Sequence, residues 1–98
     1  MKELLQQLNK AFDNKIRLGV MSVISVNRSA TFNDLKELLD LTDGNLASHI
    51  KKLEELGYIS VHKSFFERKP NTVYQITEEG KTAFEQHLKA LEAILNQQ

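Results

Sequence analysis

A helix pattern that leads directly into a strand pattern is the feature that most restricts how this chain folds. Between residues 43 and 56, apolar residues recur at spacings of four, three and three, which predicts a helix with one buried face. These residues are Leu46, Ile50, Leu53 and Leu56. Gly57 predicts the end of that helix, and residues 58–64 then alternate between apolar and polar side chains, as a half-buried strand does. The chain therefore has to bury one face of a helix and continue at once into a sheet.

The opposite face of this helix is polar and basic. It carries Asn45, Ser48, His49, Lys51 and Lys52. Side chains of these types reach base edges and phosphates, and the N-terminal residues of such a helix meet the bases in a major groove. We expect the first three to contact bases or the sugar-phosphate backbone and the two lysines to contact phosphates. The alternative is an ordinary amphipathic helix with a solvated polar face.

Residues 33–40 predict another helix just before this one. A tight turn at residues 41–44 joins the two helices; it contains Gly44, and Thr42 or Asp43 is expected to cap the second helix. Two helices joined at this distance cross steeply, so the second one lies clear of the body of the domain. This is the geometry that a major groove accepts.

The remaining patterns complete the order α-α-β-α-α-β-β-α. Before the helix pair, helices are expected at residues 2–12 and 15–26, with a small strand at residues 29–32. After it, strands are expected at residues 58–64 and 73–77, with a last helix at residues 78–95. The expected caps are Asp13 or Asn14, Asn33 and Thr77. Leu35, Leu38 and Leu39 are expected to face the core.

The two strands predict a hairpin whose loop spans residues 64–72 and contains the only proline, which cannot donate a ladder hydrogen bond. Arg68 and Lys69 lie at the tip of this loop, where an arginine can enter a narrow minor groove. Lys63 is expected to add a contact with the DNA backbone from the strand. The alternative is a solvated loop that its charges keep soluble.

Two further residues of this segment, Phe65 and Phe66, are expected to pack at the base of the hairpin rather than stack on bases.

Both ends of the chain carry an apolar stripe. The N-terminal stripe is Leu4, Leu5, Leu8 and Phe12, and the C-terminal stripe is Phe84, Leu88, Leu91 and Leu95. A three-helix core with a small hairpin cannot cover both, and uncovered apolar stripes are typical of subunit contacts. We expect a homodimer that holds two recognition helices about 34 Å apart, one turn of DNA. The alternative is that the terminal helices pack on each other within one chain.

Size and composition fit one domain over residues 1–98, with 41% hydrophobic residues and no deep, enclosed active site. The chain has no cysteine, which excludes disulfides and cysteine-ligated metals and fits a reducing cytoplasm. The first residues are amphipathic, and the apolar stretch at residues 18–26 is too short to span a bilayer. We expect a cytoplasmic protein without membrane association.

The net charge is zero, with 13 basic and 13 acidic residues, which counts against nucleic-acid binding because such domains are often basic. The distribution matters more than the sum. Residues 44–75 carry five basic and three acidic side chains, so the central part of the chain is the more positive one.

Residues typical of enzymes and metal sites are missing from the pattern. His49, His62 and His87 lie on three different elements, with no carboxylate at ligand spacing, and the last two are expected at the surface. The sequence holds no glycine-rich phosphate loop, nucleophile elbow or metalloprotease helix. We therefore expect no catalytic activity and no cofactor.

Two segments resemble the small winged-helix regulators related to MarR and ArsR. Residues 41–59 resemble the recognition segment, and residues 68–81 resemble the wing, the return strand and the start of the last helix. Together with residues 32–39, the similarity covers roughly residues 14–90. The resemblance implies a homodimeric transcriptional regulator. It places Asn45, Ser48, His49 and Lys52 at groove-facing positions and Arg68 and Lys69 in the wing.

The sequence therefore predicts a winged helix-turn-helix protein, mostly α with a small hairpin. Its core spans about residues 14–78, and its terminal helices at residues 2–12 and 78–95 serve dimerisation. We expect a repressor of transcription that inserts helix 43–56 into the major groove of double-stranded DNA and sets the 65–72 wing on the backbone or in the minor groove. Whether a small-molecule effector exists stays open.

The alternative is a winged helix that binds another protein, as an adaptor or an antagonist of a regulator. The zero net charge and the acidic Glu67 beside the wing favour that alternative.

Overall fold

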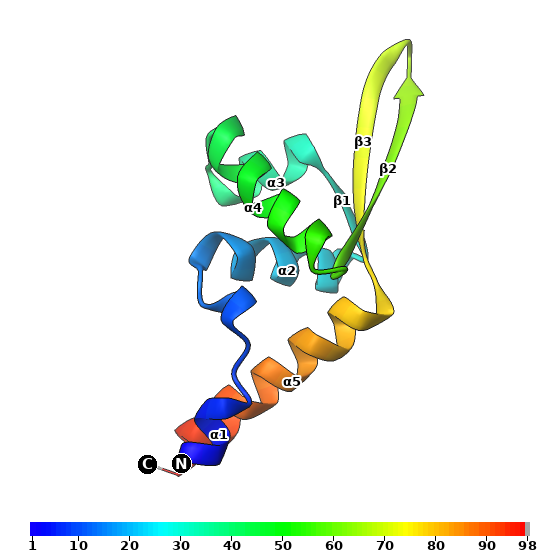
Figure 1. Ribbon diagram of the computed structural model, residues 1–98. Coiled ribbons are helices and arrows are strands. Elements are labelled where there is room, and N and C mark those ends of the chain that lie inside the picture. Colours follow the sequence, from blue (N-terminus) through cyan, green and yellow to red (C-terminus); the bar gives the residue numbers. More distant parts are fainter. Residues whose placement is uncertain (98) are drawn as a thin grey trace.

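The order of helices and strands in the computed structural model, which describes residues 1–97, follows the sequence patterns (Figure 1). In chain order the elements are α1 (Lys2–Gln6), the 3-10 helix η1 (Lys10–Phe12), α2 (Lys15–Asn27), β1 (Ser29–Thr31), α3 (Phe32–Leu39), α4 (Asp43–Glu55), β2 (Ile59–Phe66), β3 (Lys69–Ile76) and α5 (Glu78–Leu95). The predicted winged helix-turn-helix class is confirmed.

The three strands form one antiparallel sheet in the order β1-β3-β2. Ile59 pairs with Ile76 at the base of the hairpin, and Phe66 pairs with Lys69 at its far end. Residues that pair across a sheet share a face, so Ile59, Ile76 and the buried Tyr74 face the helices together.

The apolar faces of the helices meet this sheet in one core. The largest fully buried side chains are Val20, Met21 and Ile24 of α2, Leu35 of α3, and Leu46 and Leu53 of α4. The predicted buried face of α4 is confirmed. Leu38 is exposed, which corrects the prediction that it faces inward. On the helix surface, Leu38 and Leu39 lie on either side of Leu35, and the side of Leu38 falls outside the core.

Short polar side chains cap the helices, as predicted for Asn14, Thr42 and Thr77. The start of α3 differs from the prediction. Thr31, not Asn33, is its cap, because the Thr31 hydroxyl accepts from the backbone N–H of Asp34 while the Asp34 carboxylate accepts from that of Thr31. This reciprocal pair satisfies two backbone donors at once and fixes the start of the helix.

The predicted helix over residues 2–12 is interrupted. Asn9 has an extended backbone, its side chain accepts from the backbone N–H of Ala11, and its own N–H donates to Nδ1 of His87 at 3.0 Å. These bonds replace the helical ladder, so the segment divides into α1 and η1.

The hairpin is longer and its turn shorter than predicted. The strands continue through most of residues 64–72, and the turn consists of Glu67 and Arg68, both with positive φ as in type I′ turns. Pro70 lies inside β3 rather than in a loop. It is tolerated there because β1 pairs with β3 only at residues 73–75, which leaves β3 a free edge at the proline.

The molecule is elongated, with extents of 53 × 25 × 21 Å and a radius of gyration of 14.7 Å, against about 13 Å for a compact domain of this size. Figure 1 shows why: the hairpin rises from one end, and α1 lies beside the C-terminal part of α5 at the other. Within residues 1–97, no helix is both long and apolar enough to cross a membrane.

Candidate nucleic-acid interface

Buried apolar side chains and one ion pair hold α4 on the body of the domain. Its apolar face is buried through Leu46, Ile50 and Leu53. At its N-terminus, the Thr42 hydroxyl accepts from a backbone N–H of the first turn, and Asp43 forms an ion pair with Lys36 of α3 at 2.8 Å. The helix therefore presents a fixed outer flank.

That outer flank is polar and accessible. Asn45, Ser48, Lys51 and Lys52 are all exposed, as the prediction of a groove-facing surface requires. The Ser48 hydroxyl donates to the backbone carbonyl of Asn45 at 3.2 Å, so its lone pairs remain free to accept. The two lysines have no salt bridge within residues 1–97. Both are therefore available to phosphates.

His49 differs from its neighbours because it is half-buried. Its Nδ1 lies 3.0 Å from Nη1 of Arg17, a residue of α2 that sequence reasoning did not select. Burial, and secondly the positive charge of Arg17, lower the pKa of His49 below its ordinary value of 6.5. No spacing rule could have found this pair, because the two residues are 32 positions apart.

The hairpin tip is cationic and aromatic. Lys63, Arg68 and Lys69 are exposed, where the sequence places the contacts of the wing. Phe65 and Phe66 are 78% and 67% exposed, which overturns the prediction that they pack at the hairpin base. They lie at the far end of β2, where the two strands have extended beyond the core.

The two predicted DNA-contacting regions lie at the same end of the molecule. In Figure 1 the N-terminal end of α4 and the tip of β2 and β3 occupy one end, whereas α1 and the C-terminal part of α5 occupy the other. The N-terminal end of α4 and the hairpin tip can therefore approach one surface together.

The terminal stripes are only partly free. Phe12 and Phe84 are buried within the single chain, with ring centroids 5.2 Å apart, so they belong to the core instead of the expected dimer contact. The aromatic ring of Phe12 also packs against Tyr58, which explains its burial. Leu4 and Leu8 are half-buried, since α1 packs on α5. The exposed members of the stripes are Leu5, Leu88, Leu91 and Leu95.

Two histidines predicted at the surface have different surroundings. His62 is exposed, and its Nε2 lies 3.2 Å from the Ser60 hydroxyl, so that prediction is confirmed. His87 is buried, which corrects the prediction, because its Nδ1 accepts from the Asn9 backbone and its ring packs edge-on against Phe12. Within residues 1–97, no three histidine, aspartate or glutamate side chains gather to hold a metal ion.

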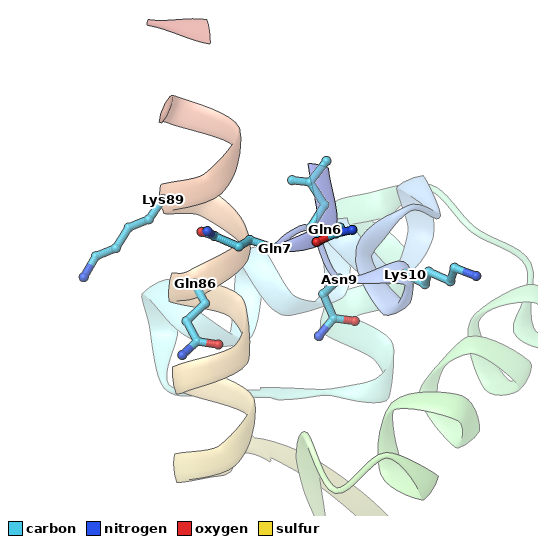
Figure 2. Close-up of a pocket in the computed structure, with 7 residues that line it drawn as sticks. Gln6, Gln7, Asn9, Lys10, Gln86 and Lys89 are labelled. Carbon is cyan, nitrogen blue, oxygen red and sulfur yellow. The ribbon is translucent and has the colours of Figure 1, made fainter. Parts of the chain in front are cut away.

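A hollow of about 610 Å³ lies between the N-terminal segment and α5, away from the candidate DNA interface (Figure 2). It is lined by Leu8 and by the labelled residues Gln6, Gln7, Asn9, Lys10, Gln86 and Lys89. Six of these seven side chains end in amide or ammonium groups, and apolar atoms, including those of Leu8, also line the hollow.

The fold, the exposed helix flank and the cationic hairpin define a winged helix DNA-binding domain. Residues 16–95 match the family of that description, and the chain belongs to it. It is 38% identical over 79 residues to an uncharacterised protein of Methanocaldococcus jannaschii, covering 81% of this chain and 86% of that protein.

Solved structures agree with this assignment. The chain superimposes on a transcriptional regulator homologue from Pyrococcus horikoshii OT3 with a TM-score of 0.88 and 36% identity, covering 98% of this chain and 96% of that one. MarR matches with a TM-score of 0.76 and 18% identity over 90% of this chain and 64% of its own, which is a likeness of fold. The predicted resemblance to MarR and ArsR regulators is confirmed, and these neighbours are transcriptional regulators rather than enzymes.

Proposed function

We propose that this chain is a sequence-specific repressor that binds double-stranded DNA as a homodimer in the cytoplasm. Membership of the winged helix DNA-binding family supports DNA as the partner. The observation that carries the proposal is that the N-terminal end of α4 and the hairpin tip lie at one end of the molecule (Figure 1), each with exposed polar or basic side chains. A rigid duplex can meet both only if they lie at one end of the molecule.

The roles of the two regions follow from their chemistry. The N-terminal half of α4 carries Asn45 and Ser48, whose amide and hydroxyl groups suit base edges in the major groove. Lys51 and Lys52 carry ammonium groups, which suit phosphates and do not distinguish bases. In the wing, Arg68 sits in the turn itself, so it is the first side chain to reach a backbone or a minor groove.

The homodimer is supported by the apolar surface at the opposite end. Leu5, Leu88, Leu91 and Leu95 are exposed on a pair of helices that extends away from the core. A two-fold axis through this surface would bury these leucines and present two α4 helices to successive turns of one duplex. Two occupied half-sites would cover enough of a promoter to exclude RNA polymerase, which is the mechanism of repression that we propose.

Selection of binding sites from a random duplex library with the purified full chain tests this proposal. We expect enrichment of an inverted repeat with half-site centres about 10 base pairs apart. Enrichment of a single half-site would contradict the dimer and leave DNA binding intact. No enrichment at low salt would contradict the proposal and favour the alternative of a protein-binding winged helix.

A further inference from the structure

Arg17 connects the N-terminal segment to the proposed reading helix. Its Nη1 lies 3.0 Å from Nδ1 of His49, and its Nε donates to the carbonyl oxygen of Ala11 at 2.7 Å. Ala11 is buried in η1, so the second anchor is a fixed one. Because the guanidinium is planar, a hydrogen bond at Nε also fixes the direction of the N–H groups at Nη1. The Arg17 guanidinium therefore holds the His49 ring at its Nδ1 edge.

This contact determines where the imidazole carries its proton. A guanidinium has only donors and stays protonated, so Nδ1 of His49 has to accept the hydrogen bond from Arg17. In the neutral ring the single proton is then on Nε2, and Nε2–H is the group left to donate elsewhere. The lowered pKa of His49 favours the neutral ring at physiological pH.

His49 also lies where such a donor would be used. It follows Asn45 by one turn of α4, adjacent to Ser48 and Lys52 on the outer flank, and it is partly open to solvent. An Nε2–H group pairs with acceptors such as guanine O6 and N7, thymine O4 or a phosphate oxygen. The other tautomer would offer a bare Nε2, which pairs with the amino groups of adenine and cytosine instead.

We propose that Arg17 is a positioning residue for DNA reading, because it holds His49 as an Nε2–H donor directed at an acceptor on the duplex. This inference rests on the proposed function. To the proposed function it adds Arg17, a residue of α2 that touches no base and still decides which base edge the reading helix prefers.

The first test reads the tautomer in the free protein. Nitrogen-15 chemical shifts of the imidazole distinguish a protonated from an unprotonated ring nitrogen. We expect unprotonated Nδ1 and protonated Nε2 at neutral pH in the unaltered chain. Arg17→Met should give a mixture of tautomers and raise the pKa of His49. Lys15→Met is the matched control, since it removes an exposed cation from the same helix and should leave both readouts unchanged.

Several results of this test would overturn the inference. A protonated Nδ1 in the unaltered chain would do so, as would nitrogen shifts that Arg17→Met leaves unchanged. If Lys15→Met changed the nitrogen shifts and the pKa of His49 as much as Arg17→Met does, Arg17 would act through its charge alone and not through its hydrogen bond. If circular dichroism shows that Arg17→Met does not fold, Arg17→Lys replaces it. That variant keeps the charge, but its donors all lie on one nitrogen and do not reproduce the separate Nε and Nη1 positions that reach Ala11 and His49, so a shift toward a mixture is again expected.

The second test reads the consequence on DNA with a double-mutant cycle. His49→Gln places an amide N–H about where Nε2–H lies and needs no tautomer. Arg17→Met should weaken binding to the selected duplex about three- to tenfold when His49 is present, the worth of one misplaced hydrogen bond. In the His49→Gln background, Arg17→Met should weaken binding less than about twofold. Equal losses in both backgrounds would show that Arg17 does not act through His49.

The two tests separate this inference from the proposed function. If the unaltered chain binds no duplex, the proposed function and the DNA part of the inference both fail. The free-protein nitrogen shifts still decide whether Arg17 fixes the tautomer. If the duplex binds and the cycle shows no coupling, the proposed function stands and the inference is refuted.

Discussion

Replacing Gly80 by alanine should destabilise this protein strongly, although alanine is the better helix former. Gly80 lies in the first turn of α5, where its backbone N–H donates to the cap Thr77 at 2.9 Å. A Cβ added there would lie 2.1 Å from the carbonyl oxygen of Tyr58 and 2.8 Å from its carbonyl carbon. That carbonyl accepts from the backbone N–H of Thr77 at 3.1 Å. The obstruction is therefore backbone already engaged in the junction between α4 and α5.

The magnitude follows from three terms. Overpacking against atoms that cannot rotate away costs about 1–3 kcal/mol, and more when backbone has to move. Displacing Tyr58 also weakens its hydrogen bond with Thr77, worth about 0.5–1.5 kcal/mol. The higher helix propensity of alanine returns about 1 kcal/mol at most. We expect Gly80→Ala to lower the free energy of unfolding by about 2–4 kcal/mol, which corresponds to a fall in Tm of about 10 °C or more.

Gly44→Ala is the matched control for this prediction. Gly44 also lies in the first turn of a threonine-capped helix, but a Cβ added there meets nothing within 4 Å. Urea unfolding of both variants at one protein concentration is the assay, because dimer formation would make apparent stability depend on concentration. Gly44→Ala should be as stable as the unaltered chain or slightly more so. Equal stability of Gly80→Ala, or equal losses in both, would refute the argument from close packing.

Three further predictions concern DNA contacts and the core. Arg68→Ala should weaken binding to every duplex alike and reduce the slope of log affinity against log salt concentration by about one, as measured by fluorescence anisotropy. An unchanged slope would contradict a contact between Arg68 and phosphate. Asn45→Ala should mainly reduce discrimination between the selected site and single-base variants, by about 1–3 kcal/mol, and a uniform loss across sequences would argue against base contact. Phe12→Ala should lower the free energy of unfolding, measured in urea, by about 3–5 kcal/mol, because the Phe12 ring is buried against Phe84. Phe66 is exposed, so Phe66→Ala should change that free energy by less than about 0.5 kcal/mol, and similar losses in both variants would contradict the assigned burial.

The parts of the fold set by short-range patterns could be predicted from the sequence. The apolar spacing of α4 and the caps Asn14, Thr42 and Thr77 depend on residues within one or two turns. The end of α4 just before Gly57, whose φ is positive, is local in the same way. These elements lie where they were predicted because tertiary contacts do not compete with the local preference.

Several errors involve contacts between distant residues, whereas the misplaced cap of α3 is a local one. The break in the N-terminal helix and the burial of His87 have one cause, a hydrogen bond between Asn9 and a residue 78 positions later. The exposure of Phe65 and Phe66 depends on how far the strand pairing extends beyond the core, which the composition of the hairpin does not reveal.

The candidate site shows the same division. Asn45, Ser48 and the lysines of α4 were found because an amphipathic helix separates its faces by spacing alone. Arg17 was missed because its role comes from the packing of α2 against α4, and nothing in the neighbouring sequence marks it.

Mapping the surface that a duplex contacts tests the central claim most directly. Backbone amide chemical shifts of this chain would be compared before and after addition of the selected duplex. The largest changes should fall on residues 43–52 and 63–69, with residues 88–95 of α5 unaffected. Changes concentrated on the terminal helices, with α4 and the hairpin tip unchanged, would contradict the claim that these two regions bind DNA together.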